Sequence, residues 1–239
     1  MLLKVDHVTR YHYAPAVRGV VQSHRLTPSR YDGQKVISWE VTVTGGEKGG
    51  AFRDGAGDWV QAWTVKGPVE EIEVRVQGVV ETTDMAGMLK GHRETVPPEA
   101  WLRDTPATEA DEALRTLADS ARHDEPLSYV HALAFAVAGA IAYKPGSTHE
   151  HTTAAEALAQ GEGVCQDHAH ALLACARHAG FPARYVSGYL FAAEDGTPHE
   201  AAHAWAEVHV PGYGWIGFDP ANRCCPDEQI GRASCRERV

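Results

Sequence analysis

The sequence predicts an α+β fold, in which a β-rich N-terminal domain precedes a core of helices packed on an antiparallel sheet. Apolar and polar residues alternate in the first third of the chain, apolar residues at helical spacing dominate the middle, and alternation returns near the end. A period of two is typical of strands with one wet face, and a period near 3.6 is typical of amphipathic helices. Because helices and strands fall in separate runs, α+β is favoured over a parallel α/β sheet.

Residues 1–83 form the predicted β-rich region. Apolar residues alternate with polar ones over residues 37–43 and again over residues 71–77. Three Gly- or Asp-rich breaks predict turns between strands, at residues 31–33, 45–46 and 54–58. The chain then becomes irregular, and we interpret residues 84–105, which include Pro97-Pro98, as a linker.

Residues 106–230 form the predicted core. Helices are expected at four places: from Thr108-x-x-Asp111 to residue 121, over an almost wholly apolar run at 128–142, after a Thr153-x-x-Glu156 capping box, and at 165–179. Strands are expected at residues 183–190, 203–210 and 215–219. The basic, aperiodic residues 231–239 resemble translated vector sequence, so we interpret them as a non-native tail and leave them out of the expected fold.

Composition excludes several classes of function. The 239 residues carry 22 Lys and Arg against 32 Asp and Glu, a net charge of −10, whereas a nucleic-acid-binding protein needs a cationic face. No run approaches the roughly 20 apolar residues that span a bilayer. Asp6 and His7 interrupt the place where a signal peptide would be apolar. We therefore expect a soluble, cytoplasmic protein with no membrane and no nucleic-acid partner.

The five cysteines are an odd number in a long chain without a C-x-x-C pair, which favours neither a disulfide framework nor a cysteine-only zinc site. Cys175 lies among Leu and Ala residues and is expected in the core. Cys224 and Cys225 are adjacent in a predicted loop and receive no role. Cys235 belongs to the excluded tail.

Cys165 differs from the others because a Gly-rich turn, Gly161-Glu-Gly-Val, delivers it to the start of a predicted helix. The free N–H groups and positive dipole end of a helix N-terminus favour a thiolate, the nucleophilic form of cysteine. A backbone N–H there could also hold an oxyanion. The neighbouring Asp167 favours the neutral thiol, so an imidazolium nearby has to supply the rest.

The predicted sheet contains a histidine that could supply this imidazolium. His203 begins one strand and Asp219 ends the next. If Val210 faced Trp215, His203 and Asp219 would lie on opposite faces of the sheet. A five-residue loop or a bulge shifts the pairing by one residue and puts both side chains on one face, within reach of each other. We predict this second register.

Two motifs carry these residues: GEGVCQDHAHALLACARHAGFPARYVSGYL at 161–190 and HAWAEVHVPGYGWIGFDP at 203–220. Together with the β-rich leader, they resemble the bacterial transglutaminase-like family, a branch of the papain-like cysteine enzymes, over about residues 1–230. The resemblance implies a triad of nucleophile Cys165, general base His203 and orienting Asp219, and a thioester acyl-enzyme. The chain departs from the family at His168, where an aromatic residue is common, and at residues 221–225, which replace a Thr-Asn-containing run.

From this resemblance we expect a cysteine-dependent hydrolase of amide, peptide or isopeptide bonds in a protein or peptide substrate, with no cofactor and no metal. Transfer to an amine, as in a protein-glutamine transglutaminase, is the alternative. Gln166 is a further candidate donor, and Trp205 and Trp215 are expected to pack or to shield the thioester. The oligomeric state stays open.

Two other classes compete with this interpretation. His199-Glu200-Ala-Ala-His203 matches the H-E-x-x-H signature of zinc hydrolases, which requires a helix to turn both histidines toward one metal. Strand-like residues 205–210 follow at once and leave little room for that helix. The third class is a non-catalytic binding scaffold, with the β-rich domain as its partner face.

Overall fold

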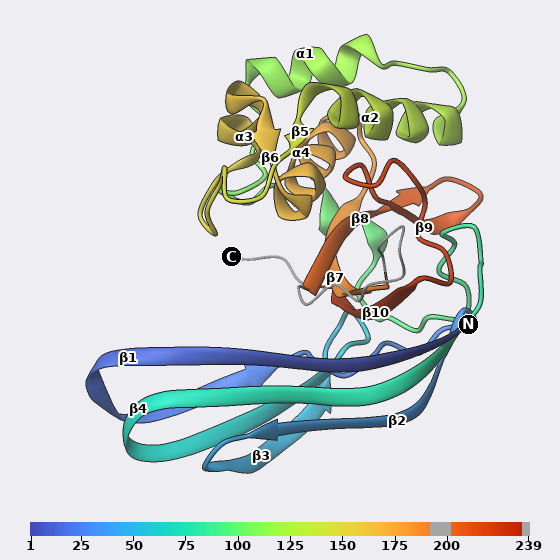
Figure 1. Ribbon diagram of the computed structural model, residues 1–239. Coiled ribbons are helices and arrows are strands. Elements are labelled where there is room, and N and C mark those ends of the chain that lie inside the picture. The colour runs from blue at the N-terminus through green and yellow to red at the C-terminus, as the bar shows by residue number, and fades with distance from the viewer. Residues whose placement is uncertain (192–201, 236–239) are drawn as a thin grey trace.

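Three layers build the fold in the computed structural model, which describes residues 1–191 and 202–235 (Figure 1). A long antiparallel sheet forms the N-terminal layer. A second, shorter antiparallel sheet lies between it and a layer of helices. The α+β fold class predicted from the sequence is confirmed.

The N-terminal sheet contains four strands, β1 (Leu2–His24), β2 (Gln34–Val43), β3 (Gly46–Arg53) and β4 (Trp59–Thr82). β4 is central, because β1, β2 and β3 all pair with it in antiparallel fashion. The alternating segments at 37–43 and 71–77 lie in β2 and β4, as predicted. The inward residues of this period-two pattern form a small core that includes Trp63, Val65, Ile72 and Val74.

The described residues contain a 3-10 helix, η1 (Pro98–Leu102), and four α-helices: α1 (Glu112–Ser120), α2 (Pro126–Ala140), α3 (Ala154–Gln160) and α4 (Cys165–His178). The capping box at α3 is confirmed, since the Thr153 hydroxyl accepts from the backbone N–H of Glu156, and the Glu156 carboxylate accepts from that of Thr153. α1 begins later than expected. Asp111, not Thr108, caps it, and accepts a 2.8 Å hydrogen bond from the backbone N–H of Leu114.

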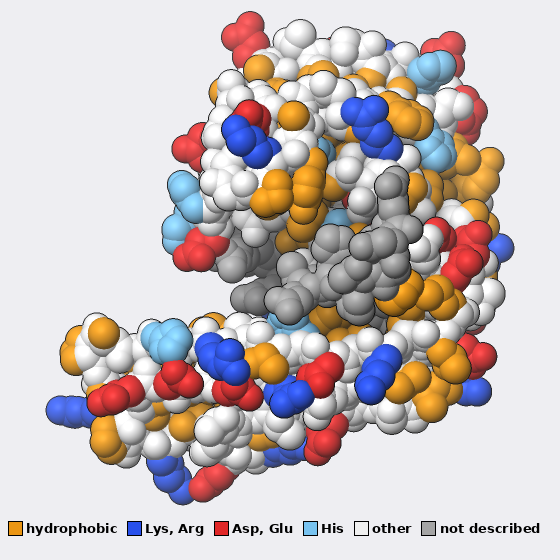
Figure 2. Space-filling view, in the orientation of Figure 1, with side chains coloured by type: hydrophobic (Ala, Val, Ile, Leu, Met, Phe, Trp, Pro, Cys, Tyr) orange, Lys and Arg blue, Asp and Glu red, His pale blue; other side chains and the backbone are white. Residues whose placement is uncertain are grey.

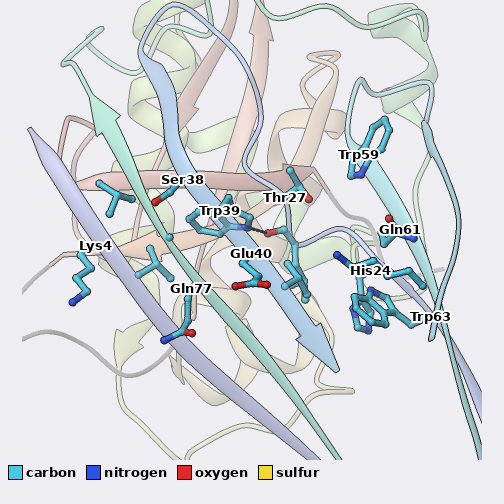
Figure 3. A pocket seen from close by; sticks show the side chains of 16 residues that line it. Lys4, His24, Thr27, Ser38, Trp39, Glu40, Trp59, Gln61, Trp63 and Gln77 are labelled. Carbon is cyan, nitrogen blue, oxygen red and sulfur yellow. Dashed lines mark hydrogen bonds between the residues drawn. The ribbon is translucent and has the colours of Figure 1, made fainter. Parts of the chain in front are cut away.

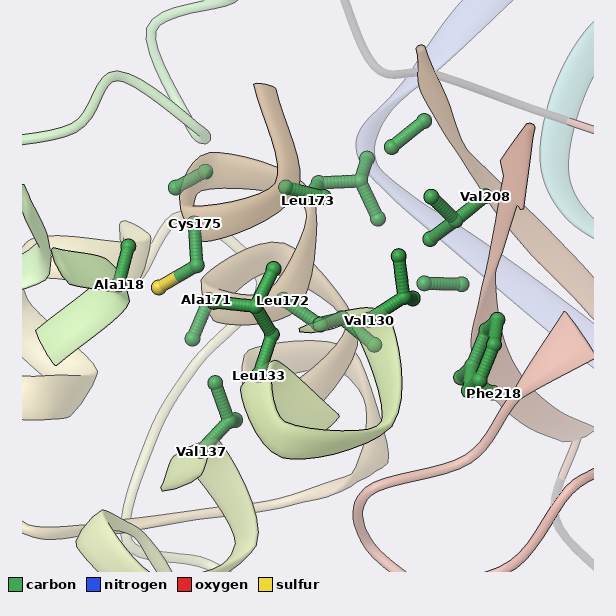
Figure 4. Packing of buried hydrophobic residues seen from close by; sticks show 14 of the residues in the cluster. Ala118, Val130, Leu133, Val137, Ala171, Leu172, Leu173, Cys175, Val208 and Phe218 are labelled. Atoms are coloured by element: carbon green, nitrogen blue, oxygen red, sulfur yellow. The ribbon is translucent and has the colours of Figure 1, made fainter. Parts of the chain in front are cut away.

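α4 is the central helix of the core and is buried from Asp167 to Arg177 (Figure 4). The almost wholly apolar sequence of α2 is typical of a helix buried all round, but α2 buries one face only, through residues such as Val130, Leu133 and Val137. Phe135 on its other face is 62% exposed. The apolar composition of α2 therefore overstated its burial, because one side of it meets no other layer.

The second sheet has the order β10-β7-β8-β9, with β7 (Ala183–Leu190), β8 (Ala202–Val210), β9 (Gly214–Phe218) and β10 (Ile230–Cys235). A separate two-residue parallel pair, β5 (Ala142–Tyr143) and β6 (Glu162–Gly163), ties the end of α2 to the turn before α4. α4 packs on β8, so the helical layer covers one face of this sheet.

The segment expected to be a linker, 84–105, is docked on the second sheet. Gly87 accepts a 2.8 Å hydrogen bond from Gly217, and Leu89 donates one of 2.9 Å to Trp215, so this segment lines the outer edge of β9. The Glu94 carboxylate binds the Arg184 guanidinium. An aperiodic stretch can hold extended backbone against a sheet edge, and pattern alone does not show this.

The exclusion of residues 231–239 from the fold is wrong for 231–235, which lie in β10 and pair with β7. The Arg232 guanidinium is 2% exposed and bonds both oxygens of Glu207 in β8, at 2.6 and 3.0 Å. Its backbone exchanges hydrogen bonds with the Gln34 side chain of the N-terminal sheet. β10 thus joins the two sheets, although its composition resembles that of a tail.

Candidate active site

Cys165 is the first residue of α4 and is half-buried. The Asp167 carboxylate accepts hydrogen bonds from the backbone N–H of Val164, at 2.7 Å, and from the Thr148 hydroxyl, at 2.6 Å. A side chain at Gly163 would collide with Asp167, which explains the glycine in the preceding turn. Asp167 therefore caps the start of the helix that carries Cys165.

The predicted register of β8 and β9 is confirmed. Val210 pairs with Gly214 and Ala206 with Phe218, so even-numbered residues pair with even-numbered ones and odd-numbered with odd-numbered ones. The turn contains three residues, 211–213, and is shorter than expected. His203 and Asp219 consequently lie on one face, where Nε2 of His203 is 2.6 Å from Oδ2 of Asp219.

His203 also bonds the Cys165 side chain, so the structure brings the three residues proposed from the sequence together. Burial of the ring lowers the pKa of His203, but the hydrogen bonds to Asp219 and Cys165 and the charges on these partners outweigh it and raise the pKa to about 9. The Trp205 ring stacks on the imidazole, with centroids 6.1 Å apart. The imidazolium is therefore the stable form of His203 at neutral pH.

Asn222 belongs to this site and was not identified from the sequence. Its side-chain amide donates to Oδ2 of Asp219 at 2.8 Å, and its backbone N–H bonds Oδ1 at 3.2 Å. The same amide nitrogen is 3.3 Å from Nε2 of His203. An asparagine three residues after an aspartate in a turn was the available signal, because short polar side chains commonly bond nearby turn groups.

His168, the departure from the family pattern, is buried in α4, three residues after Cys165. Its Nδ1 is 2.9 Å from the carbonyl oxygen of Val164, and its Nε2 is 2.9 Å from that of Ile141. The ring thereby links the start of α4 to the end of α2, a link that a phenylalanine could not make. Tyr143, 57% exposed, lies beside this site, and burial together with the charges of Cys165 and Asp219 raises its pKa.

The remaining candidates have structural contacts. Trp205 and Trp215 are 2% and 7% exposed, which agrees with the expected packing role. Cys175 is fully buried as predicted, and burial raises its pKa to about 12. Gln166 donates to the Glu150 carbonyl at 3.4 Å. Cys224 pairs through its backbone with Asp219.

The zinc-site alternative depends partly on His199 and Glu200, which lie outside the described residues. Across residues 1–191 and 202–235, no three His, Cys, Asp or Glu side chains gather in a way that could hold a metal ion. Among the helices of these same ranges, none has the length and apolar character to cross a bilayer.

In a comparison with known proteins, each half of the chain matches a family profile. Residues 115–220 match the profile of the transglutaminase-like superfamily, and residues 3–81 match that of the bacterial transglutaminase-like N-terminal region. An uncharacterised protein of Mycobacterium leprae is 32% identical over 238 residues, covering 92% of this chain and 83% of the relative. An uncharacterised Mycobacterium tuberculosis protein is 29% identical over 260 residues, covering 96% and 82%.

A solved structure shows the same fold. The crystal structure of a Cytophaga hutchinsonii protein, named as a candidate cysteine protease, superposes with a TM-score of 0.72 at 20% identity. The match covers 99% of this chain and 84% of that protein. By its two matched regions, its relatives and its fold, this chain belongs to the transglutaminase-like superfamily and carries the bacterial transglutaminase-like N-terminal region.

Proposed function

We propose that this protein is a cysteine-dependent acyl-transfer enzyme that hydrolyses amide, peptide or isopeptide bonds of a protein or peptide substrate. Cys165 is the nucleophile, His203 the general acid and base, and Asp219 the orienting carboxylate. The observation that carries the proposal is the His203 ring, hydrogen-bonded to Asp219 at 2.6 Å and to Cys165, with its pKa raised to about 9.

The reaction begins from a thiolate–imidazolium pair. The Cys165 sulfur attacks the carbonyl carbon and forms a C–S bond, and the carbonyl oxygen becomes an oxyanion near the free N–H groups at the start of α4. Collapse breaks the C–N bond, and the His203 imidazolium gives its proton to the leaving amine. Neutral His203 then takes a proton from water, whose oxygen attacks the thioester, and the released acid leaves the thiolate–imidazolium pair restored.

Asp219 and Asn222 keep the imidazole oriented through these steps. The carboxylate holds Nε2 of His203, which leaves the other ring nitrogen for the sulfur. The amide of Asn222 and its backbone N–H restrain both oxygens of the same carboxylate. Asn222 touches neither substrate nor sulfur in this scheme, so it acts as a positioning residue.

Amine transfer is the second candidate, because the thioester is common to both reactions. An amine that attacks the thioester in place of water gives a cross-link or an amine-modified glutamine. Incubation with a glutamine-containing protein and a fluorescent primary amine separates the two outcomes, since only transfer attaches the label to the protein.

The thiolate–imidazolium pair is tested by a limiting dose of iodoacetamide at pH 5–9, with mass spectrometry to locate the label. Cys175 is an internal control in the same chain, because it is fully buried and its pKa is raised to about 12. Cys165 should label fastest, stay reactive below pH 7, and lose that advantage in His203→Ala. Labelling of Cys165 at the rate of a plain thiol, or labelling unaffected by His203→Ala, contradicts the proposal. If the protein proved inactive but still bound a partner, this result would favour the non-catalytic binding scaffold.

A further inference from the structure

A hollow of about 690 Å³ lies on the N-terminal domain, lined by no residue of the proposed triad (Figure 3). All four strands, β1 to β4, contribute to its wall, together with the segment that follows β1. Its size falls within the roughly 300–1,000 Å³ that is usual for small-molecule sites. The proposed acyl transfer uses none of these side chains.

Three tryptophans line the hollow and come from two strands, Trp39 from β2 and Trp59 and Trp63 from β4. The close-up in Figure 3 shows their indoles spread along the hollow and not gathered into a cage. Trp63 is 5% exposed, whereas Trp39 and Trp59 are half-buried. Trp39 and Trp59 therefore offer two flat, partly exposed platforms, while Trp63 belongs to the core of this sheet.

Each indole is held in place by its own contact. Nε1 of Trp39 donates to the Leu26 carbonyl at 2.9 Å, and its ring lies over Gly78, where any side chain would collide with it. The Arg53 guanidinium, which is not part of the lining, stacks 5.8 Å from the Trp59 ring centre. The Lys48 ammonium lies 5.4 Å from that of Trp63. Such restraint lowers the entropic cost of binding a ligand.

Polar groups of different kinds surround these platforms. Lys4 and Lys48 bring ammonium groups, Glu40 a carboxylate, and Gln61 an amide oxygen, since the Gln61 amide nitrogen already donates to backbone carbonyls. Small aliphatic side chains also line the hollow. A nucleic acid would need a single positive sign, and Figure 2 shows charged groups of both signs mixed over this domain.

We propose that this hollow binds an extended, β-linked oligosaccharide. The weakly positive C–H groups on the flat face of a β-linked gluco-configured ring suit the negative face of an indole. Sugar hydroxyls both donate and accept hydrogen bonds, so a single ligand can satisfy ammonium, carboxylate and amide groups together. A β-1,4 chain is extended and can pass over the two partly exposed indoles, whereas an α-1,4 chain coils.

The proposal is tested by calorimetric titration of the whole protein with cellotetraose and with tetra-N-acetylchitotetraose, and tryptophan emission provides a second readout. Maltotetraose is the control for linkage. A proline decamer is the control for peptide binding, because aromatic grooves also bind proline-rich segments. At least one β-linked tetrasaccharide should bind at micromolar to millimolar concentration, and more tightly than either control.

Trp59→Ala should weaken this binding by about tenfold, the loss of one stacking platform. Phe135→Ala, which removes an exposed aromatic ring of α2 outside the hollow, should leave it unchanged. Gln61→Ala is the second variant in case Trp59→Ala lowers the melting temperature. Cys165→Ala should bind as the wild type does, so the result does not depend on the proposed reaction.

Three results would overturn the proposal. The first is absence of binding by both β-linked sugars at millimolar concentration. The second is equal or tighter binding of maltotetraose or of the proline decamer. The third is binding that survives unchanged in both Trp59→Ala and Gln61→Ala.

Discussion

Replacing Glu207 by glutamine would test the buried charge cluster that joins β7, β8 and β10. Glu207 accepts a 2.8 Å hydrogen bond from Arg184 and a 2.6 Å bond from Arg232, and all three side chains are at most 3% exposed. Burial alone would raise the pKa of Glu207, but the two guanidinium groups lower it to about 2. Glutamine keeps the shape and removes the charge that both arginines face.

The expected cost follows from these contacts. Removing one partner of a buried ion pair costs about 3–5 kcal/mol. We expect a loss in this range and not twice as much, because Arg184 keeps the Glu94 carboxylate and Arg232 keeps Asp58, 3.6 Å away. At about 2–4 °C per kcal/mol for a chain of this size, the melting temperature should fall by roughly 6–20 °C.

Urea unfolding of the wild type and of Glu207→Gln measures this loss. Glu73→Gln is the matched control, because Glu73 pairs with an Arg10 that is 58% exposed, and such a pair contributes about 0–1 kcal/mol. Equal losses in the two variants would refute the reasoning. Arg232→Leu should lower the free energy of unfolding by about as much as Glu207→Gln does. If Arg232→Leu left the stability unchanged, β10 would not belong to the folded structure.

The same cluster predicts a dependence of stability on pH. The pKa of Glu207 in the folded state, about 2, lies below its ordinary value of 4.5. The stabilisation is therefore present above pH 4.5 and is lost as the pH falls toward 2. Glu207→Gln should show a smaller loss of stability in acid, and an acid limb identical to that of the wild type would contradict this assignment.

Three further changes test the site and its support. Asp219→Asn should lower kcat/KM by about 10²–10⁴-fold while the protein stays folded, because the imidazole loses its orienting charge. In the wild type the rate should fall above pH 9, where the His203 imidazolium, with its pKa raised to about 9, loses the proton that the leaving amine needs. Asn222→Ala should lower kcat about tenfold and move this alkaline limb, since the amide restrains the Asp219 carboxylate. Thr153→Ala should cost about 1 kcal/mol of stability through loss of the α3 cap, without changing the labelling of Cys165.

Separate measurements would contradict these expectations. A pH–rate profile that shows no fall above pH 9 would contradict the thiolate–imidazolium mechanism. A loss of kcat in Asn222→Ala that is matched by unfolding, with the alkaline limb unmoved, would reduce Asn222 to a structural role.

The stability that the His203 pairing contributes is present below pH 6.5 and is lost as the pH rises through 9, because the pKa of His203 is higher in the folded state. Unfolding experiments across that interval check the sign.

Local sequence patterns predicted much of the candidate active site. The Gly-rich turn predicted that Cys165 would begin a helix, and α4 begins there. The positions of His203 and Asp219 in successive strands, combined with the two-residue period of a sheet, predicted a shared face, which the 2.6 Å hydrogen bond confirms. Each of these inferences depends on backbone geometry within a few residues or within one hairpin. Such local geometry follows from the order of neighbouring residues, so the sequence is enough to predict it.

Contacts between distant segments could not be predicted from local sequence patterns. Arg232 looked like part of a basic tail, yet it is buried against Glu207, 25 residues away, and against Gln34 of the other sheet. Within the aperiodic segment 84–105, residues 87–89 pair through their backbone with the edge of β9, and such pairing places few demands on side chains. Long-range pairing depends on which surfaces meet once the layers pack, and a one-dimensional pattern records the burial of a residue but not its partner.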